Sequence, residues 1–432
     1  MNQFTASLWG DESWAATLAI KPYLEIITTV ARDTSPPLYY LCLHTWMKFF
    51  GTGEVSIRAL SFVFFLATCF FVYLIGQKLW DKKTGLIAAL ACFLNPFLFQ
   101  YGFEGRMYSI LLLTSTAATY FYLAKNRLGY VLAATAALYS HHFSIFVIFT
   151  HFLWEIPNFF NKKEGLVKTI KPYIIIGLLY LPWLYPLYYQ TSLVGSGFWL
   201  GKPTLKSLGE LLGTFFLNPA RGMTRSLLII GFGGAFLFRR WGEIKKELVL
   251  VSLFIIPIGL TYLISQFYSS IFYDRYMLYV IPPILLLLAS QRRKVSFLLI
   301  GLYLLILIPL NYHYFTHPTK RPFRELANYV KSLDLKDMAL INYNDRAHHL
   351  FESKYYQIPA PIYVPEGNLP FFTGTALMAE GDTIKGLPDK FIIIAITSGN
   401  PKKVELPNYQ FEKEKSFGSL KLVWLERLKT TR

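Results

Sequence analysis

The chain has 432 residues, of which 53% are hydrophobic, 17% are aromatic and only 16% are charged. This composition, with a mean hydropathy of +0.36, indicates a membrane protein with many spans. The formal charge of +17 would suit nucleic acid, but the basic residues gather in short loops between apolar runs, where they set membrane orientation. We therefore expect no nucleic-acid partner.

Residues 1–56 are predicted to form an acidic loop with interfacial helices on the outer side of the membrane. Two adjacent carboxylates, Asp11 and Glu12, precede every long apolar segment. The stretch 33–37 contains two prolines and should interrupt any helix, because proline lacks an amide donor and restricts the residue before it. The aromatic stretch Leu38–Phe50 is too short to span comfortably, so we expect it to lie in the interface.

The segment 57–312 is predicted to be a transmembrane helical domain. A helix needs about 20 apolar residues to cross a hydrocarbon core of about 30 Å. On this basis the fold class is an all-α polytopic membrane protein of about ten transmembrane helices. The predicted spans are 57–77, 86–101, 107–124, 129–140, 143–157, 172–190, 226–240, 247–266, 276–290 and 296–312.

The distribution of basic residues predicts the orientation of these spans. Among the connections between the predicted spans, counted with the span ends beside them, those after the first, third, fifth, seventh and ninth spans hold 16 lysines and arginines and the others hold 6. The positive-inside rule places the first group in the cytoplasm. The acidic N-terminal loop, the other connections and everything beyond residue 312 then face outward. We expect an integral protein of the plasma (inner) membrane with an extracytoplasmic site. The long connection at 191–225 is expected to be either a lid or an amphipathic interfacial segment.

The tail at 313–432 is more polar and is predicted to be a small extracytoplasmic α/β domain. A helix is expected at 322–332, and strands at 338–342, 391–396 and 420–425. Nothing in this domain is predicted to be catalytic, although we expect it to pack over the site and help to hold the acceptor.

An ordered set of short motifs resembles a known family. The motifs are Leu-Trp-Gly-Asp-Glu at 8–12, Ser-Pro-Pro-Leu-Tyr-Tyr at 35–40, Phe-Glu-Gly-Arg-Met-Tyr at 103–108, Tyr-Ser-His-His-Phe at 139–143 and Asp-Arg-Tyr at 274–276. In this order they resemble the polytopic GT-C glycosyltransferases, in the branch of the protein mannosyltransferases and lipid A aminoarabinose transferases. Members normally carry a transmembrane helix before the acidic loop, so we expect an upstream start or a truncated chain.

The resemblance implies transfer of a sugar from a polyprenyl-phosphate carrier to an acceptor, which is a lipid, polysaccharide or protein. Arg106 and Arg275 are expected to hold the phosphate, because a guanidinium offers paired donors and keeps its charge at low dielectric. The departing phosphate gains charge, which a preorganised arginine stabilises more strongly than the ground state. The further residues expected around the lipid phosphate are Asp33, Glu104, Tyr108, His141 and Tyr276.

Asp11 is the predicted general base. An acceptor hydroxyl is too weakly acidic to attack unaided, so a carboxylate within hydrogen-bond reach should take its proton. Glu12 is expected to orient Asp11 or the acceptor, and its charge would raise one of the two pKa values. A single displacement of this kind inverts the anomeric configuration. No divalent metal or other cofactor is expected.

Other interpretations remain open at this stage. Adjacent acids in a loop are often a solvated turn, and Glu104 with Arg106 could be a surface ion pair. A transporter or lipid flippase would also show many spans, but the chain has no paired Gly- or Pro-interrupted helices in matching halves. A non-catalytic membrane scaffold would keep the spans and need no outer acid.

Overall fold

The structure is a computed structural model that describes residues 1–159, 166–237, 244–290, 294–343 and 348–428. The chain divides into two compact units. The first unit comprises residues 1–33, 43–57 and 317–432, and the second comprises 34–42 and 58–316. The N-terminal acidic segment therefore shares a unit with the tail.

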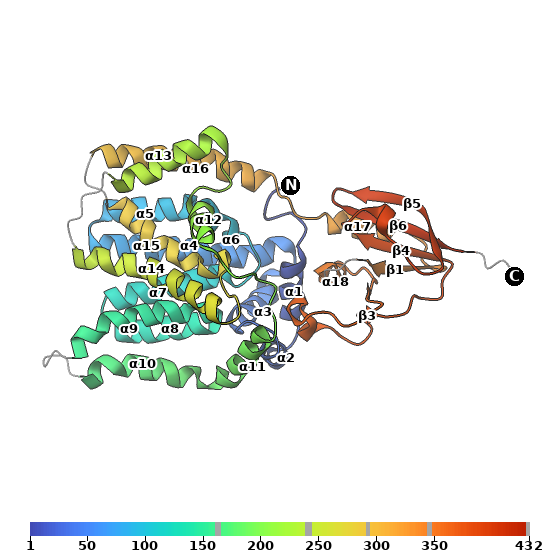
Figure 1. Cartoon of the computed structure of the whole chain (residues 1–432), viewed down its shortest axis with the longest axis horizontal. Coiled ribbons are helices and arrows are strands. Elements are labelled where there is room, and N and C mark those ends of the chain that lie inside the picture. The colour runs from blue at the N-terminus through green and yellow to red at the C-terminus, as the bar shows by residue number, and fades with distance from the viewer. Residues whose placement is uncertain (160–165, 238–243, 291–293, 344–347, 429–432) are drawn as a thin grey trace. The chain divides into compact units, whose positions relative to one another are not determined.

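The second unit is helical, and its long helices run in roughly the same direction in Figure 1. Its helices are the later parts of α4 (Glu54–Leu79) and the early part of α3 (Leu38–Phe50), followed by α5 (Lys82–Leu94), α6 (Pro96–Gly102), α7 (Tyr108–Leu123), α8 (Arg127–Ser140), η1 (His142–Ser144), α9 (Ile145–Phe159), α10 (Leu166–Tyr180), η2 (Leu181–Trp183), α11 (Leu184–Gly195), α12 (Leu205–Phe216), α13 (Gly222–Leu237), α14 (Ile244–Phe267), η3 (Asp274–Val280), α15 (Ile281–Ala289) and α16 (Lys294–Thr316).

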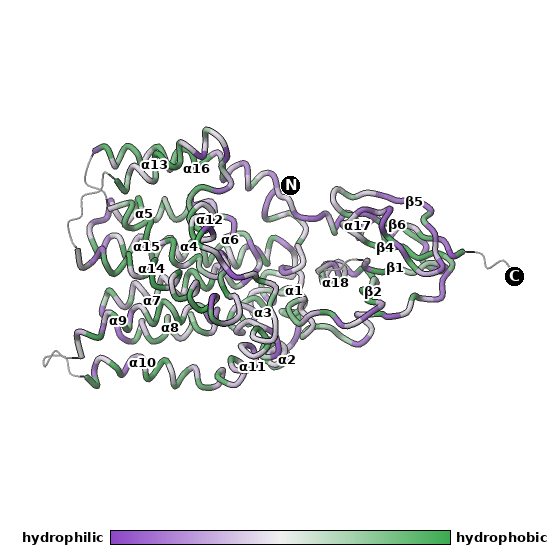
Figure 2. Tube along the Cα trace, viewed as in Figure 1, coloured by the Kyte–Doolittle hydropathy of each residue, from purple (hydrophilic) through white to green (hydrophobic). Residues whose placement is uncertain are grey.

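Four helical segments in the described ranges are long and apolar enough to cross a membrane, or five if one bent pair counts as a span. The four are Glu54–Leu79, Leu166–Gly195, Lys246–Phe267 and Lys294–Thr316. Figure 2 shows predominantly hydrophobic residues along the helices of this unit. The remaining predicted spans coincide with shorter helices or helix pairs, so an integral membrane protein is supported and the total of about ten spans stays a prediction.

One sequence-based prediction needs correction. The predicted span 86–101 is not one straight helix, because α5 and α6 meet at an angle of 68°. Pro96 cannot donate to the helix before it, and the side chain of Asn95 accepts the Leu98 amide at 3.0 Å, which starts α6 afresh. The connection at 191–225 contains α12, and its role as a lid or as an interfacial segment stays a prediction. The carbonyl oxygens of Gly201 and Pro203 also accept bonds from the side chains of Ser270 (2.8 Å) and Gln266 (2.6 Å).

Close helix crossings in the second unit depend on glycine. A Cβ atom placed on Gly76 of α4 would lie 2.6 Å from the Cα atom of Gly85 in α5. A side chain at either position would force the two backbones apart.

The first unit contains α1 (Gly10–Ala19), α2 (Tyr23–Ala31) and the tail elements α17 (Phe323–Val330), β1 (Met338–Asn342), α18 (His348–Tyr355), β2 (Ile362–Tyr363), η4 (Phe371–Thr373), η5 (Thr375–Leu377), β3 (Thr383–Ile384), β4 (Ile392–Thr397), η6 (Pro401–Lys403), β5 (Tyr409–Phe417) and β6 (Leu420–Arg427). The six strands form one mixed sheet in the order β3-β2-β1-β4-β6-β5. Strands β1 to β4 pair in parallel, whereas β6 pairs antiparallel to β4 and β5. The predicted α/β tail is confirmed.

Both faces of this sheet are covered, which explains why its central strands are almost entirely apolar. Phe323 and Leu326 of α17 pack on one face with Ile394, while Ile393 faces a second cluster with Val404 on the other side.

Hydrogen bonds join the N-terminal segment to the tail within the first unit. The Leu8 amide donates to the Tyr356 hydroxyl at 2.8 Å, and that hydroxyl donates to the Glu54 carboxylate at 2.9 Å. The guanidinium of Arg324 in α17 also donates to Glu54 and to the carbonyl of Thr5, in both cases at 2.9 Å. Segments from the two ends of the chain are therefore held in one unit.

Candidate functional site

Arg275 lies at the start of η3 in the second unit, on a wall of aromatic rings. Its guanidinium carbon is 4.7 Å from the ring centre of Tyr273 and 5.4 Å from that of Tyr108. Its amide donates to the Asp274 carboxylate at 2.7 Å, which fixes the first turn. Cation–π contacts of this kind hold a guanidinium in place without using its N–H donors. Tyr276 continues the wall, since its ring centre is 6.4 Å from that of Tyr108 and the two rings are stacked.

Arg106 lies in the tight turn between α6 and α7. Its amide donates to the Glu104 carbonyl at 2.7 Å, and its guanidinium donates to the Tyr40 hydroxyl at 3.4 Å. That hydroxyl is also 3.2 Å from the Ser35 hydroxyl. The predicted residue Glu104 is buried in this turn.

The charges of both arginines act on the buried imidazole of His141. Burial lowers the pKa of this imidazole well below its usual value, and the charges of His142, Arg106 and Arg275 lower it further. Its Nδ1 accepts the Phe143 amide at 3.2 Å, so a neutral ring carries its proton on Nε2. The ring centre lies 4.9 Å from that of Tyr276. The second unit therefore gathers Arg106, Arg275, Tyr108, Tyr276 and His141 around one region, and their role in binding the lipid phosphate stays a prediction.

A cavity of about 220 Å³ lies next to this cluster and is lined by Asp274, Tyr101 and Gln100, among others. Burial raises the pKa of Asp274, and its contacts with Arg275 oppose this rise. The connection before α12 reaches the same region, because the rings of Trp199 and Tyr273 meet edge to face at 5.1 Å. Sequence reasoning assigned no role to Asp274 or Tyr273.

Asp11 and Glu12 lie in the first turn of α1 in the first unit. Glu12 is fully buried, and its carboxylate accepts the Trp9 amide at 3.3 Å. This bond satisfies an amide at the start of the helix, so the observed contact of Glu12 is with the backbone of its own helix. Asp11 is partly exposed. An acid at a helix N-terminus is also favoured by the helix dipole, which stabilises its ionised form.

The tail positions α1 through a closely packed loop. The Trp14 indole donates to the Gly374 carbonyl at 3.3 Å. Gly374 has a φ of +85°, and a Cβ atom there would lie 2.7 Å from the Trp14 ring and 2.9 Å from that of Phe351. Only glycine fits this conformation and this space.

Glu352 of α18 is the residue that sequence reasoning missed. Its side chain is fully buried, and neither carboxyl oxygen accepts a hydrogen bond from a described residue. Burial raises its pKa to about 8, with Arg321 and Lys320 opposing the rise and Asp11 and Glu12 adding to it. The tail therefore places a third carboxyl in the electrostatic environment of the predicted base. No local motif distinguishes Glu352, because the signal is its packing against a helix more than 300 residues away in sequence.

Asp33 follows α2 in the first unit, where its amide donates to the Val30 carbonyl at 3.0 Å. Asp11, Glu12 and Asp33 thus belong to one unit, and Arg106, Arg275 and His141 to the other. A single site built from both sets stays a prediction. Among the described residues, no three His, Cys, Asp or Glu side chains form a group that could hold a metal ion.

Residues 34–189 match the family of dolichyl-phosphate-mannose-protein mannosyltransferases. Over this segment, about a third of the chain, the sequence is similar to that family. The resemblance to membrane glycosyltransferases that use lipid-phosphate sugars is thereby confirmed, and the segment includes Glu104, Arg106, Tyr108 and His141. No curated protein matches the chain in sequence.

Solved structures share the fold. ArnT from Cupriavidus metallidurans in the apo state has a TM-score of 0.67 at 11% identity, covering 97% of this chain and 94% of its own. The same protein bound to undecaprenyl phosphate has a TM-score of 0.64 at 11% identity, covering 99% of this chain and 95% of its own. The Archaeoglobus fulgidus oligosaccharyltransferase in complex with Zn and sulfate gives 0.50 at 14% identity, covering 90% of this chain and 64% of its own. The overall fold is therefore that of ArnT, and it extends through the tail.

Proposed function

We propose that this protein transfers a sugar from a polyprenyl-phosphate donor to an acceptor hydroxyl on the outer face of the plasma membrane. The observation that carries the proposal is the cluster of Arg106, Arg275 and neutral His141 within a segment order typical of lipid-phosphate-dependent glycosyltransferases. ArnT, whose fold the chain shares, has been solved with undecaprenyl phosphate. We further propose about ten spans and the division into 1–56, 57–312 and 313–432.

The donor phosphate is held by the second-unit cluster in this proposal. Arg275 stacks on the Tyr108 and Tyr273 rings through its face, and in this proposal N–H groups at the edge of its plane bind phosphate oxygens. His141 adds one neutral N–H donor and no further charge. As the bond between sugar and phosphate breaks, the leaving phosphate gains negative charge, and these prepositioned donors stabilise it.

Asp11 takes the proton of the acceptor hydroxyl as that oxygen attacks the anomeric carbon from the side opposite the phosphate. One carbon–oxygen bond forms while the other breaks, so the configuration inverts. Glu12 holds the start of α1 through the Trp9 amide and so orients its neighbour. Asp33, Glu104, Tyr108 and Tyr276 complete the proposed donor site. The reaction as written needs no divalent metal.

The decisive experiment replaces Asp11 with Asn. We expect turnover to fall at least about a hundredfold, the usual contribution of a general base, and carrier-linked sugar to persist in membranes. Asp337→Asn is the matched control, because Asp337 is an exposed acid of the same unit. Unchanged consumption of carrier-linked sugar by Asp11→Asn protein would refute the assignment. If the protein were a transporter or a scaffold, the substitution would leave consumption of carrier-linked sugar unchanged.

A further inference from the structure

A second polar cavity, of about 510 Å³, lies at the opposite end of the helices from the proposed donor site. It is lined by residues of the α7–α8 turn, the end of α9 and the beginning of α10. Helix α8 starts at this cavity and ends beside His141. Its 14 residues, at 1.5 Å each, separate the two regions by about 20 Å. The cavity is therefore not part of the proposed donor site.

The α7–α8 turn contributes Lys125 and Arg127 to the lining of this cavity. Lys125 adopts a left-handed conformation with φ of +55°, which is uncommon for a residue with a Cβ atom. The Asn126 side chain then accepts the Gly129 amide at 2.9 Å and starts α8 at Arg127. The short turn thereby places Lys125 and Arg127 on either side of one capping residue.

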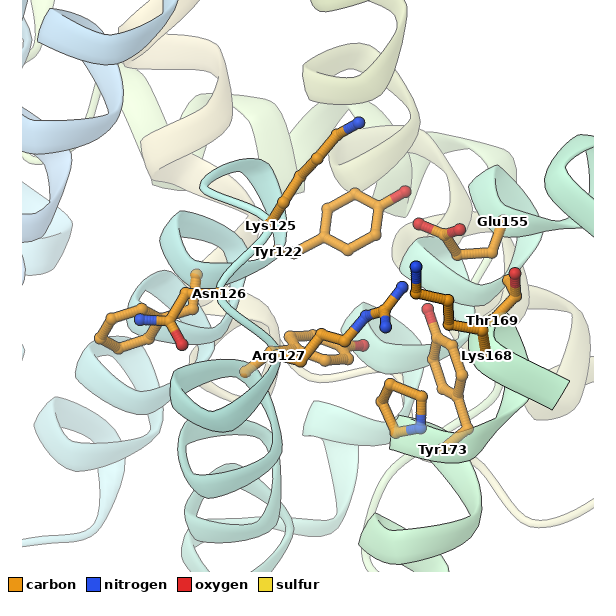
Figure 3. Close-up of a pocket in the computed structure, with 11 residues that line it drawn as sticks. Tyr122, Lys125, Asn126, Arg127, Glu155, Lys168, Thr169 and Tyr173 are labelled. Atoms are coloured by element: carbon orange, nitrogen blue, oxygen red, sulfur yellow. The ribbon is translucent and has the colours of Figure 1, made fainter. Parts of the chain in front are cut away.

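Cationic and hydroxyl groups converge within the cavity. Figure 3 shows the ends of Arg127, Lys168 and Tyr173 directed toward one another, with the Glu155 carboxylate beyond Lys168. Lys125 extends away from this group in the same view. Two cations and a phenol near one carboxylate leave a positive balance, and a guanidinium beside an ammonium is a combination that binds phosphate oxygens.

The inner wall of the cavity is aromatic. The ring centre of Tyr130 is 5.8 Å from those of both Tyr122 and Tyr173, and Tyr122 stacks on His151 at 4.5 Å. Tyrosine rings are favoured at headgroup depth, where one edge contacts hydrocarbon and the hydroxyl contacts polar groups. The cavity also opens at the lysine-rich side of the bundle. Basic cavities between helices on that side suit anionic lipid headgroups.

We propose that this cavity binds the phosphate of an anionic lipid headgroup, with Arg127 and Lys168 as the phosphate-binding side chains and Tyr173 as a hydroxyl donor. The chemistry recognised is a phosphate diester in a headgroup of net negative charge. The aromatic wall and the position at the lysine-rich end of the helices favour a lipid as its source. This inference is independent of the proposed transfer reaction, because no residue of the donor site lines the cavity.

The test measures lipid retention by native mass spectrometry. The full chain is incubated with phosphatidylglycerol or with phosphatidylcholine, and the doubly substituted Arg127→Gln/Lys168→Gln protein is treated in parallel. We expect phosphatidylglycerol to be retained in preference to phosphatidylcholine, and its affinity to fall roughly ten- to thirtyfold in the variant. Both side chains are exposed, so the variant should fold.

Lys78→Gln/Lys82→Gln is the charge-matched control. These two lysines are exposed near the first lysine-rich connection and do not line the cavity. The proposal is supported if this control retains as much phosphatidylglycerol as the unsubstituted protein. An equal loss in both variants would indicate unspecific attraction and overturn it. Inorganic phosphate is the third probe: loss of phosphate binding in Arg127→Gln/Lys168→Gln with unchanged lipid retention would identify a soluble anion instead and reject the lipid.

Discussion

The surroundings of His141, Arg275 and Glu352 set the protonation state of each side chain. Burial lowers the pKa of the His141 imidazole, and the charges of His142, Arg106 and Arg275 lower it further, so the neutral ring can donate a hydrogen bond without adding a third cation. Arg275 remains charged in any accessible pH range, and its aromatic wall replaces the water that would otherwise surround it. Glu352 is neutral near pH 7 because the interior disfavours its charge.

Replacement of Arg275 by Lys tests whether paired donors or charge alone are needed. A lysine keeps the positive charge but loses the planar donor pair and the stacking on Tyr273. We expect turnover to fall about tenfold or more with the protein still folded. The measurement is consumption of carrier-linked sugar by isolated membranes. Arg221→Lys, at an exposed position of the same unit, should behave like the parent, and equal activity of Arg275→Lys would show that charge alone suffices.

Glu352 predicts a specific pH dependence of stability. Its pKa is about 8 in the folded protein and about 4.3 in an unfolded chain. Between these values the folded protein binds a proton that the unfolded chain has released, so stability falls as pH rises from about 4.5 to about 8 and then levels off. Glu352→Gln cannot titrate. It should remove this part of the decline and raise the melting temperature at pH 8.

The measurement for this prediction is the apparent melting temperature in detergent from pH 5 to pH 9. Glu366→Gln is the control, since Glu366 is exposed in the same tail and its loss should leave the profile of the parent. A parallel decline in the parent and in Glu352→Gln would show that Glu352 is ionised throughout.

At the scale of elements, local chemistry predicted most helices and strands but not their breaks and partners. Strand β1 has the predicted limits 338–342, and α3 has the predicted limits Leu38–Phe50. The bend at Asn95–Pro96 was missed because an apolar window gives no weight to one capping side chain and one proline. Strand β5 was missed because it is an edge strand with mostly exposed polar residues.

The contact between Gly374 and α1 is the element-level feature with the clearest test. Gly374→Ala combines a strained φ of +85° with a Cβ atom 2.7 Å from the Trp14 ring. The conformational cost is about 1–2 kcal/mol, and the overpacking adds about 1–3 kcal/mol. Unfolding of the unit, followed by tryptophan fluorescence, should shift to a clearly lower temperature.

Gly381→Ala isolates the conformational part of this cost. Gly381 has a φ of +87°, but a Cβ atom there meets nothing within 4 Å. We expect this control to lose only the conformational part of the stability, about 1–2 kcal/mol. Equal shifts for both substitutions would mean that the Trp14 contact contributes nothing.

At the scale of the whole molecule, the two units differ in how far sequence could predict them. The helices of the second unit follow from apolar length and loop charge, which are local properties. Which segments make up the first unit depends on long-range contacts. Arg324 and Tyr356 donate hydrogen bonds to Glu54, which is about 300 residues away in sequence. The residues of the candidate site likewise fall into those that local sequence predicts and those that depend on long-range packing. Its motif residues could be named from sequence, whereas Glu352 required the packed structure.

Deletion of residues 317–432 tests whether the tail is needed for transfer. The truncated chain keeps all the helices of the second unit but loses α18 and the loop that contacts Trp14. We expect helical circular dichroism of the membrane-extracted bundle to persist while consumption of carrier-linked sugar falls to background. Normal turnover by the truncated chain would show that α1 positions Asp11 without the tail.

The hydrogen bonds between Leu8, Tyr356 and Glu54 have a consequence for biosynthesis. A ribosome makes α1 more than 300 residues before its packing partner α18, so the helix with Asp11 must wait for translation of the intervening chain before it docks. We expect chains that stop early to be idle. A cell would then lose no lipid-linked sugar to unfinished copies, because competence arrives only after α18 has been synthesised.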